Sequence, residues 1–204
     1  MVARVRTNPR KQATQARAAA TVEAILNATA RILVKEGYDH ASTNKVAATA
    51  GVSIGSLYQY FPSKEALVAA LAERHLQEMR ALIYGELPKL LSLPVAAGIE
   101  RAVRLMVAAH SVDPKLHKVL VEQVPRVGKL ERVEGLEREM VGLTASYLEA
   151  RKDEVAVRDF ELSAYVAVGM IESLTHAAVL TRPEILGEPF IREVTRAVVR
   201  YLTD

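Results

Sequence analysis

Side chains between residues 43 and 64 carry groups that proteins use to bind nucleic acids. The amide of Gln59 can pair with the edge of an adenine. Thr43 and Asn44 open a short helical pattern, where a small hydroxyl and unpaired backbone N–H groups can bind a phosphate. Gly55 permits close approach of the backbone to a partner. These groups can act only if the helices that carry them present them outward.

The elements that must position these groups are two very short helices. Ser42 is a suitable N-cap for the first, and Gly51 supplies the left-handed residue that ends it. Ser53 can cap the second. Because helices this short are unstable alone in water, they require a packing surface. We expect this surface from a helix between about residues 21 and 36, which Gly37 ends.

The spacing of three residues predicts a helix-turn-helix. Ala47 lets the two short helices approach closely, Gly51 makes the turn, and Leu57 fills the angle between them. In this arrangement the second helix enters the DNA major groove. Taken alone, the spacing is a weak signal in an alanine-rich helical protein.

A longer string of residues is more specific and resembles the DNA-binding domain of the tetracycline-repressor (TetR) family. The matching residues are Gly37-Tyr38, Ser42-Thr43, Val46-Ala47, Ala50-Gly51-Val52-Ser53, Gly55-Ser56-Leu57-Tyr58, Tyr60-Phe61 and Lys64-Glu65-Ala66-Leu67. The resemblance covers residues 20 to 70. It implies an all-helical, homodimeric transcription regulator whose larger C-terminal domain binds a small molecule.

Chemistry and the matching family positions together give candidate DNA contacts. Ile54 suits contact with a thymine methyl, whereas Tyr58, Tyr60 and Lys64 resemble phosphate-binding positions. Tyr60 is equally compatible with the domain core, and Lys64 with a solvated lysine. A cation at a helix start opposes the helix dipole, which favours a functional reason for Lys64. The predicted contacts are Thr43, Asn44, Ile54, Gly55, Ser56, Tyr58, Gln59, Tyr60 and Lys64.

Positive charge is concentrated in the part of the chain that contains this motif. Residues 1–64 hold nine Lys or Arg and three Asp or Glu, a balance of +6, while the remainder holds 18 basic and 21 acidic residues, a balance of −3. Such a distribution is typical of a phosphate-binding region. Residues 1–20 contain five basic residues and no acidic one. We expect a flexible arm there, either a solvated tail or a segment that enters the DNA minor groove.

The chain contains no cysteine. Disulfides, thiolate metal sites and cysteine nucleophiles are therefore excluded, and a cytoplasmic protein fits this composition best. The basic N-terminus is not followed by an apolar run, so we do not interpret it as a secretory signal.

Further helical patterns follow the motif. A helix from Ser63 to about Glu86 should connect the DNA-binding domain to the rest, with Leu87-Pro88 as its end. The later patterns begin at Asp113-Pro114 or span about residues 95–110, 129–151, 159–181 and 189–202.

The pattern over residues 159–181 is apolar nearly all round and predicts a helix covered on several faces. We reject a membrane span, because the Glu172 carboxylate near its midpoint would cost ~2.5 kcal/mol or more in a bilayer. With the amphipathic helix that follows, it suits a four-helix bundle made by two chains. A bundle within one chain is the alternative. The predicted dimer contacts are Phe190, Val194, Val198 and Tyr201.

A polar seam along the same apolar helix gives the candidate effector site. Tyr165, Gly169, Glu172 and His176 lie on one side, and buried polar groups need partners. The partner can be a ligand, although such histidines are more often satisfied within a core. The predicted ligand-binding residues are Met106, His110, His117, Tyr147, Tyr165, Glu172 and His176. We predict no metal site, because no H-E-x-x-H motif is present.

These observations predict an all-α chain of about nine helices. It should have an arm at 1–20, a three-helix helix-turn-helix domain at 21–67, and a helical effector-binding and dimerisation domain at 68–204. No nucleophile elbow or glycine-rich phosphate loop is present, so we predict no catalytic residue and no cofactor. The expected partners are double-stranded operator DNA, an unknown small-molecule effector and a second copy of the chain.

The favoured function is a repressor released from a pseudo-palindromic operator by its ligand. Two alternatives remain open. One is an activator or a regulator controlled by a protein partner. The other is a helical small-molecule-binding protein or enzyme with a vestigial helix-turn-helix.

Overall fold

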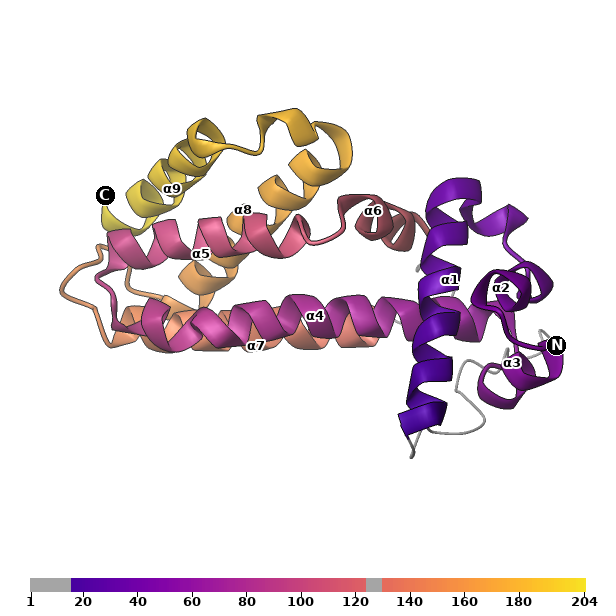
Figure 1. The fold of residues 1–204 in the computed structure, drawn as a ribbon. Helices are drawn as coiled ribbons and strands as arrows, with labels where there is room; N and C mark the ends of the chain where they lie inside the picture. The colour runs from indigo at the N-terminus through magenta and orange to yellow at the C-terminus, as the bar shows by residue number, and fades with distance from the viewer. Residues whose placement is uncertain (1–15, 124–129) are drawn as a thin grey trace, which may run out of the picture. The chain divides into compact units, whose positions relative to one another are not determined.

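The computed structural model describes residues 16–123 and 130–204, which form an all-α structure, as the sequence predicts (Figure 1). The described residues contain nine α-helices and one short 3-10 helix, and no strand. They separate into two compact units. The first contains the described residues up to Gln77 and those from Lys115 to Leu130. The second contains residues 78–114 and 131–204. The domain boundary predicted after residue 67 falls within helix α4, Lys64–Ser92, which both units share.

Helix α1, Ala16–His40, provides the packing surface of the first unit. It begins before the predicted position, so residues 16–20 are helical, while the rest of the predicted arm lies outside the described residues. Gly37 has φ 77°, a left-handed conformation that interrupts the helix where the sequence predicts its end. Ile25 and Leu33 of α1 are buried in one core with Phe61 and with Leu116 of α6, Pro114–Gln123.

Helix α4 is longer than predicted. The sequence places its end at Leu87-Pro88, but the helix continues through Pro88 to Ser92. The prediction was wrong because a proline removes one intrahelical hydrogen bond without always ending a helix; it can also kink one.

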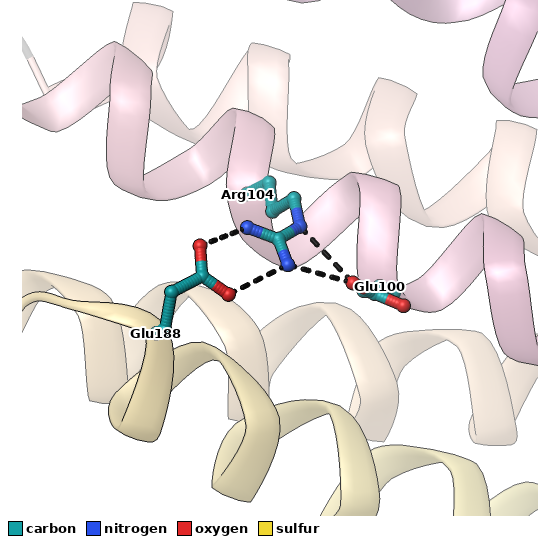
Figure 2. Close-up of polar contacts among 3 residues, drawn as sticks. All are labelled: Glu100, Arg104 and Glu188. Carbon is teal, nitrogen blue, oxygen red and sulfur yellow. Dashed lines mark hydrogen bonds and ion pairs between the residues drawn. The ribbon is translucent and has the colours of Figure 1, made fainter.

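The second unit is built on helices α5, α8 and α9, which pack against one another (Figure 1). Their bounds are Val95–His110, Phe160–Thr181 and Glu188–Thr203, with a 3-10 helix at Pro183–Ile185 before α9 and with α7, Leu130–Glu149, preceding α8. The spacing of Ile191, Val194, Val198 and Leu202 places them on one buried face of α9. Figure 2 shows that Arg104 of α5 donates hydrogen bonds to Glu188 at the start of α9 and to Glu100 on its own helix.

One expectation about α9 is corrected by the burial pattern. Val194 and Val198 are 5% and 0% exposed within one chain, so they belong to the intramolecular core and do not supply the predicted dimer contacts. Phe190 packs against the same core, whereas Tyr201 is 37% exposed. The side chains Leu162, Tyr165 and Leu174 of helix α8 are exposed within one chain.

Among the described residues, α8 is the one helix that is long and apolar enough to cross a membrane by length and composition. Core helices of soluble proteins meet the same criterion. Its small buried residues, such as Ala164 and Ala167, pack in the core that α5 and α9 share.

Candidate nucleic-acid interface and effector cavity

The turn between helices α2, Thr43–Ala50, and α3, Ile54–Tyr60, has the backbone conformation that the sequence predicts. The Ser42 hydroxyl accepts a hydrogen bond from the Lys45 backbone N–H at 3.3 Å, which caps α2. Gly51 has φ 68°, and the backbone N–H of Val52 donates to the Ala47 carbonyl at 3.0 Å. This hydrogen bond satisfies a carbonyl at the helix end and fixes the direction of the following residues.

Helix α3 has a sealed inner face and an exposed outer face. Its N-cap Ser53 accepts a hydrogen bond from the Ser56 backbone N–H at 3.0 Å, and Leu57 is 0% exposed in the core. The outer face carries Ile54, Gly55, Tyr58 and Gln59, all exposed, while Ser56 is half-buried. The segment after Gly51 therefore points its candidate base contacts toward solvent.

A hydrogen bond joins two of the proposed phosphate-binding residues, Thr43 on α2 and Tyr58 on α3. The Thr43 and Tyr58 hydroxyl oxygens lie 3.1 Å apart, and Asn44 beside Thr43 is exposed. Each hydroxyl can donate to only one acceptor while accepting from others. The pair therefore holds one donor that can turn toward a phosphate at the first turn of α2.

Two of the predicted DNA contacts have structural roles. Tyr60 is 8% exposed and lies in the core of the first unit, so we remove it from the candidate contacts. The Lys64 ammonium donates to the Tyr38 carbonyl at 3.0 Å and lies 4.0 Å from the centroid of the Tyr38 ring. It therefore ties the start of α4 to the end of α1, which explains a cation at this helix start without DNA.

The polar residues predicted to form an effector site are divided between the two units. His117 lies beside His75, with ring nitrogens 3.1 Å apart. In the second unit, the His110 and His176 ring centroids are 5.6 Å apart. Tyr165 is 59% exposed on the outer face of α8.

Glu172 and His176 are half-buried on α8. Burial raises the pKa of Glu172, to which the nearby Glu137 carboxylate adds, and burial lowers the pKa of His176. Both shifts favour the uncharged forms, which is consistent with an environment poor in water.

The second unit contains an apolar cavity of about 90 Å³. Met106 and Tyr147, two of the predicted ligand-binding residues, line it, whereas His110, Tyr165, Glu172 and His176 do not. The prediction followed polar groups, and the cavity is lined by aliphatic side chains of α8 with residues of α4, α5 and α7. The remaining lining residues, which the sequence did not reveal, are Ile83, Leu87, Leu90, Leu91, Gly98, Ile99, Ala102, Leu105, Met140, Leu143, Thr144, Ala167, Val168 and Ile171.

Two family models match the chain. Residues 25–71 match the model described as bacterial regulatory proteins of the tetR family, and residues 94–202 match the tetracyclin repressor-like C-terminal domain. The chain belongs to the TetR family. It is accordingly a transcriptional regulator with an N-terminal DNA-binding domain, and the resemblance deduced from its helix-turn-helix is confirmed.

The chain is also similar to individual proteins and solved structures. The uncharacterised helix-turn-helix-type transcriptional regulator YvdT of Bacillus subtilis is 38% identical over 65 residues, which are 32% of this chain and 34% of that protein. A regulator assigned to the TetR family from Mesorhizobium loti has a similar structure, with TM-score 0.71 and 20% identity over 93% of this chain and 100% of its own. The structure of a SmeT–triclosan complex gives TM-score 0.61 and 18% identity over 91% of this chain and 92% of that one.

Proposed function

We propose that the chain is a homodimeric, cytoplasmic repressor that binds a pseudo-palindromic operator and is released from it by a small-molecule ligand. The observation that carries the proposal is the exposed outer face of α3, fixed by the capped turn at Gly51. A TetR-family regulator needs such a helix to reach base edges in the major groove.

The exposed residues divide into base contacts and backbone contacts. Gln59 reads a base edge through its amide, and Ile54 contacts a thymine methyl. Thr43, Asn44 and Tyr58 bind phosphates, which positions the helix without reading sequence. Gly55 and Ser56 allow the backbone of α3 to approach the groove. Lys64 adds positive charge near the phosphates while its ammonium binds Tyr38.

A second copy of the chain completes the DNA interface. One recognition helix makes too small an interface for tight specific binding, whereas two related by a two-fold axis read half-sites about one helical turn, ~34 Å, or more apart. The exposed apolar side chains Leu162, Tyr165 and Leu174 of α8, with Tyr201 of α9, supply a surface for this contact.

Release from DNA follows from a difference in ligand affinity between two conformers. The ligand binds better to a conformer whose recognition helices are wrongly spaced for adjacent major grooves. It lowers operator affinity by that difference alone. The SmeT structure contains triclosan, so a protein of similar fold binds a small molecule.

A mobility-shift assay tests the proposal. The full-length chain is titrated against the DNA upstream of its own gene at several salt concentrations. We expect a shift whose affinity falls steeply as salt rises, because binding releases counterions from phosphates. Absence of salt-sensitive binding at every protein concentration would overturn both regulatory functions and leave the small-molecule-binding alternative.

A further inference from the structure

The lining of the cavity in the second unit is almost entirely hydrocarbon. No Asp, Glu, Lys, Arg or His is among the described residues that line it. The polar side chains in the lining are Thr144 and Tyr147, both on α7. Because they are three residues apart on a helix, their side chains start from neighbouring parts of one face.

The Tyr147 hydroxyl already makes one hydrogen bond within the protein. It donates a hydrogen bond to the Leu93 carbonyl at 2.9 Å, so its hydrogen is committed and its oxygen remains able to accept. Gly98 makes the space for it, since a Cβ at that position would lie 2.2 Å from the Tyr147 hydroxyl oxygen. Burial raises the pKa of Tyr147, which keeps the hydroxyl neutral.

The cation nearest to this hydroxyl is already engaged. The Arg151 guanidinium lies 4.2 Å from the centroid of the Tyr147 ring and donates to the Leu91 carbonyl. Glu154 lies 3.9 Å from the same guanidinium. An anionic ligand in the cavity would therefore lose its hydration without gaining an unengaged counter-charge, which is strongly unfavourable.

We propose that the cavity binds an uncharged, largely hydrocarbon small molecule with one hydroxyl group, and that this molecule is the effector of the repressor proposed above. The ligand hydroxyl donates to the Tyr147 oxygen and accepts from the Thr144 hydroxyl. Its hydrocarbon part fills the space among the aliphatic side chains. This assignment rests on the proposed function for its regulatory meaning, and on the cavity alone for the class of ligand.

The volume limits the size of the ligand. A single buried water needs about 10–15 Å³, so a cavity of about 90 Å³ is large enough for a small molecule. We take 1-octanol as the probe, because it has one hydroxyl and a hydrocarbon chain. Octanoate has the same chain length but a negative charge, and the two form a matched pair of probes.

The test is isothermal titration calorimetry of the full-length protein with 1-octanol and with octanoate at neutral pH. We expect 1-octanol to bind at least tenfold more tightly than octanoate. Equal or tighter binding of octanoate would overturn the uncharged class, and absence of heat from 1-octanol up to saturation would overturn the site.

Variants locate the binding in the cavity. Ala102→Leu fills part of it and should weaken 1-octanol binding at least tenfold, whereas Ala97→Leu makes the same change on the exposed face of α5 and should leave binding unchanged. Thr144→Val keeps the side-chain shape and removes the hydroxyl, so it should weaken 1-octanol binding severalfold. If circular dichroism shows that Ala102→Leu does not fold, the Thr144→Val variant tests the site in its place. Unchanged 1-octanol affinity in Thr144→Val overturns the assignment of the hydroxyl.

These measurements contain no DNA, so the two proposals can fail separately. Selective 1-octanol binding without any operator binding would leave the ligand class intact and remove the repressor. Operator binding without 1-octanol binding would leave the repressor intact and remove the ligand class.

Discussion

Helices α2 and α3 of the first unit carry the proposed DNA contacts on their outer faces, whereas α4, α5, α7 and α8 of the second unit surround a cavity. On helix α3 of the first unit, the residues that give stability and those proposed to bind are different. Leu57 is sealed in the core and Gln59, two residues later, is exposed. In the second unit the same aliphatic side chains line the cavity and pack the helices. Binding and stability are therefore separable on helix α3, and coupled at Lys64 and in the second unit.

The largest expected effect is a loss of stability in the core that supports α3, the proposed recognition helix. Leu57→Ala should lower the free energy of unfolding by about 2–5 kcal/mol, because it leaves a cavity at a fully buried position. Urea denaturation followed by circular dichroism measures the change. Leu82→Ala, at a position 41% exposed, is the matched control and should change stability by about 0.5 kcal/mol or less. Equal losses in the two variants would contradict a recognition helix held by Leu57.

The outer face of α8 should matter for assembly and not for folding of one chain. Leu174 is 44% exposed, so Leu174→Glu places a charge in the proposed dimer contact without disturbing the core. We expect the dimer to dissociate at least a hundredfold more readily, about 2.7 kcal/mol, since a buried unpaired charge is strongly unfavourable. Sedimentation velocity over a range of concentrations measures this. A dimer of unchanged affinity would place the contact on another surface.

Base reading and backbone binding should separate within the first unit. Gln59→Ala should lose about 1–3 kcal/mol of discrimination between operator sequences while stability stays constant, because its side chain is exposed. Lys64→Ala should weaken binding to all sequences and reduce the salt dependence, and it should also lower stability slightly by removing the contact with Tyr38. A sequence-selection experiment on both variants checks the roles, and identical profiles would refute them.

The contrast between the two units also explains what the sequence could predict. The caps at Ser42 and Ser53 and the turn at Gly51 are local signals, because each acts on residues within a few positions in the chain. Their geometry is confirmed. The burial of Tyr60 and the contact between Lys64 and Tyr38 depend on distant packing, which spacing along the chain does not determine.

The cavity was missed for a related physical reason. Helix α8 is apolar on most sides, so its sequence does not specify which face turns to the core. The prediction was based on polar residues such as Tyr165, whereas the residues of α8 that line the cavity include Ala167 and Ile171. A different ambiguity placed Val194 and Val198 in a dimer interface. Their spacing on α9 specifies a buried face but not whether the same chain or a second copy covers it, and they complete the intramolecular core. A cavity lined by aliphatic side chains has no local sequence signal.

The smallest expected effect is a pH dependence that originates in the second unit. Burial and the Glu137 carboxylate raise the pKa of Glu172 in the folded chain. Between the ordinary pKa of a glutamate and this higher value, the folded state therefore holds the proton more tightly than the unfolded state. Stability should therefore fall as pH rises through this window and stay lower above it.

Glu172→Gln should remove this slope and raise stability at neutral pH, which urea denaturation at several pH values measures. Glu161→Gln, on the exposed face of the same helix, is the control for loss of one charge and should retain the slope. Because Glu172 lies outside the cavity lining, its replacement should leave 1-octanol affinity unchanged. If Glu172→Gln instead weakened that affinity as Thr144→Val does, the polar seam and the cavity would form one site, and the separation between them would be wrong.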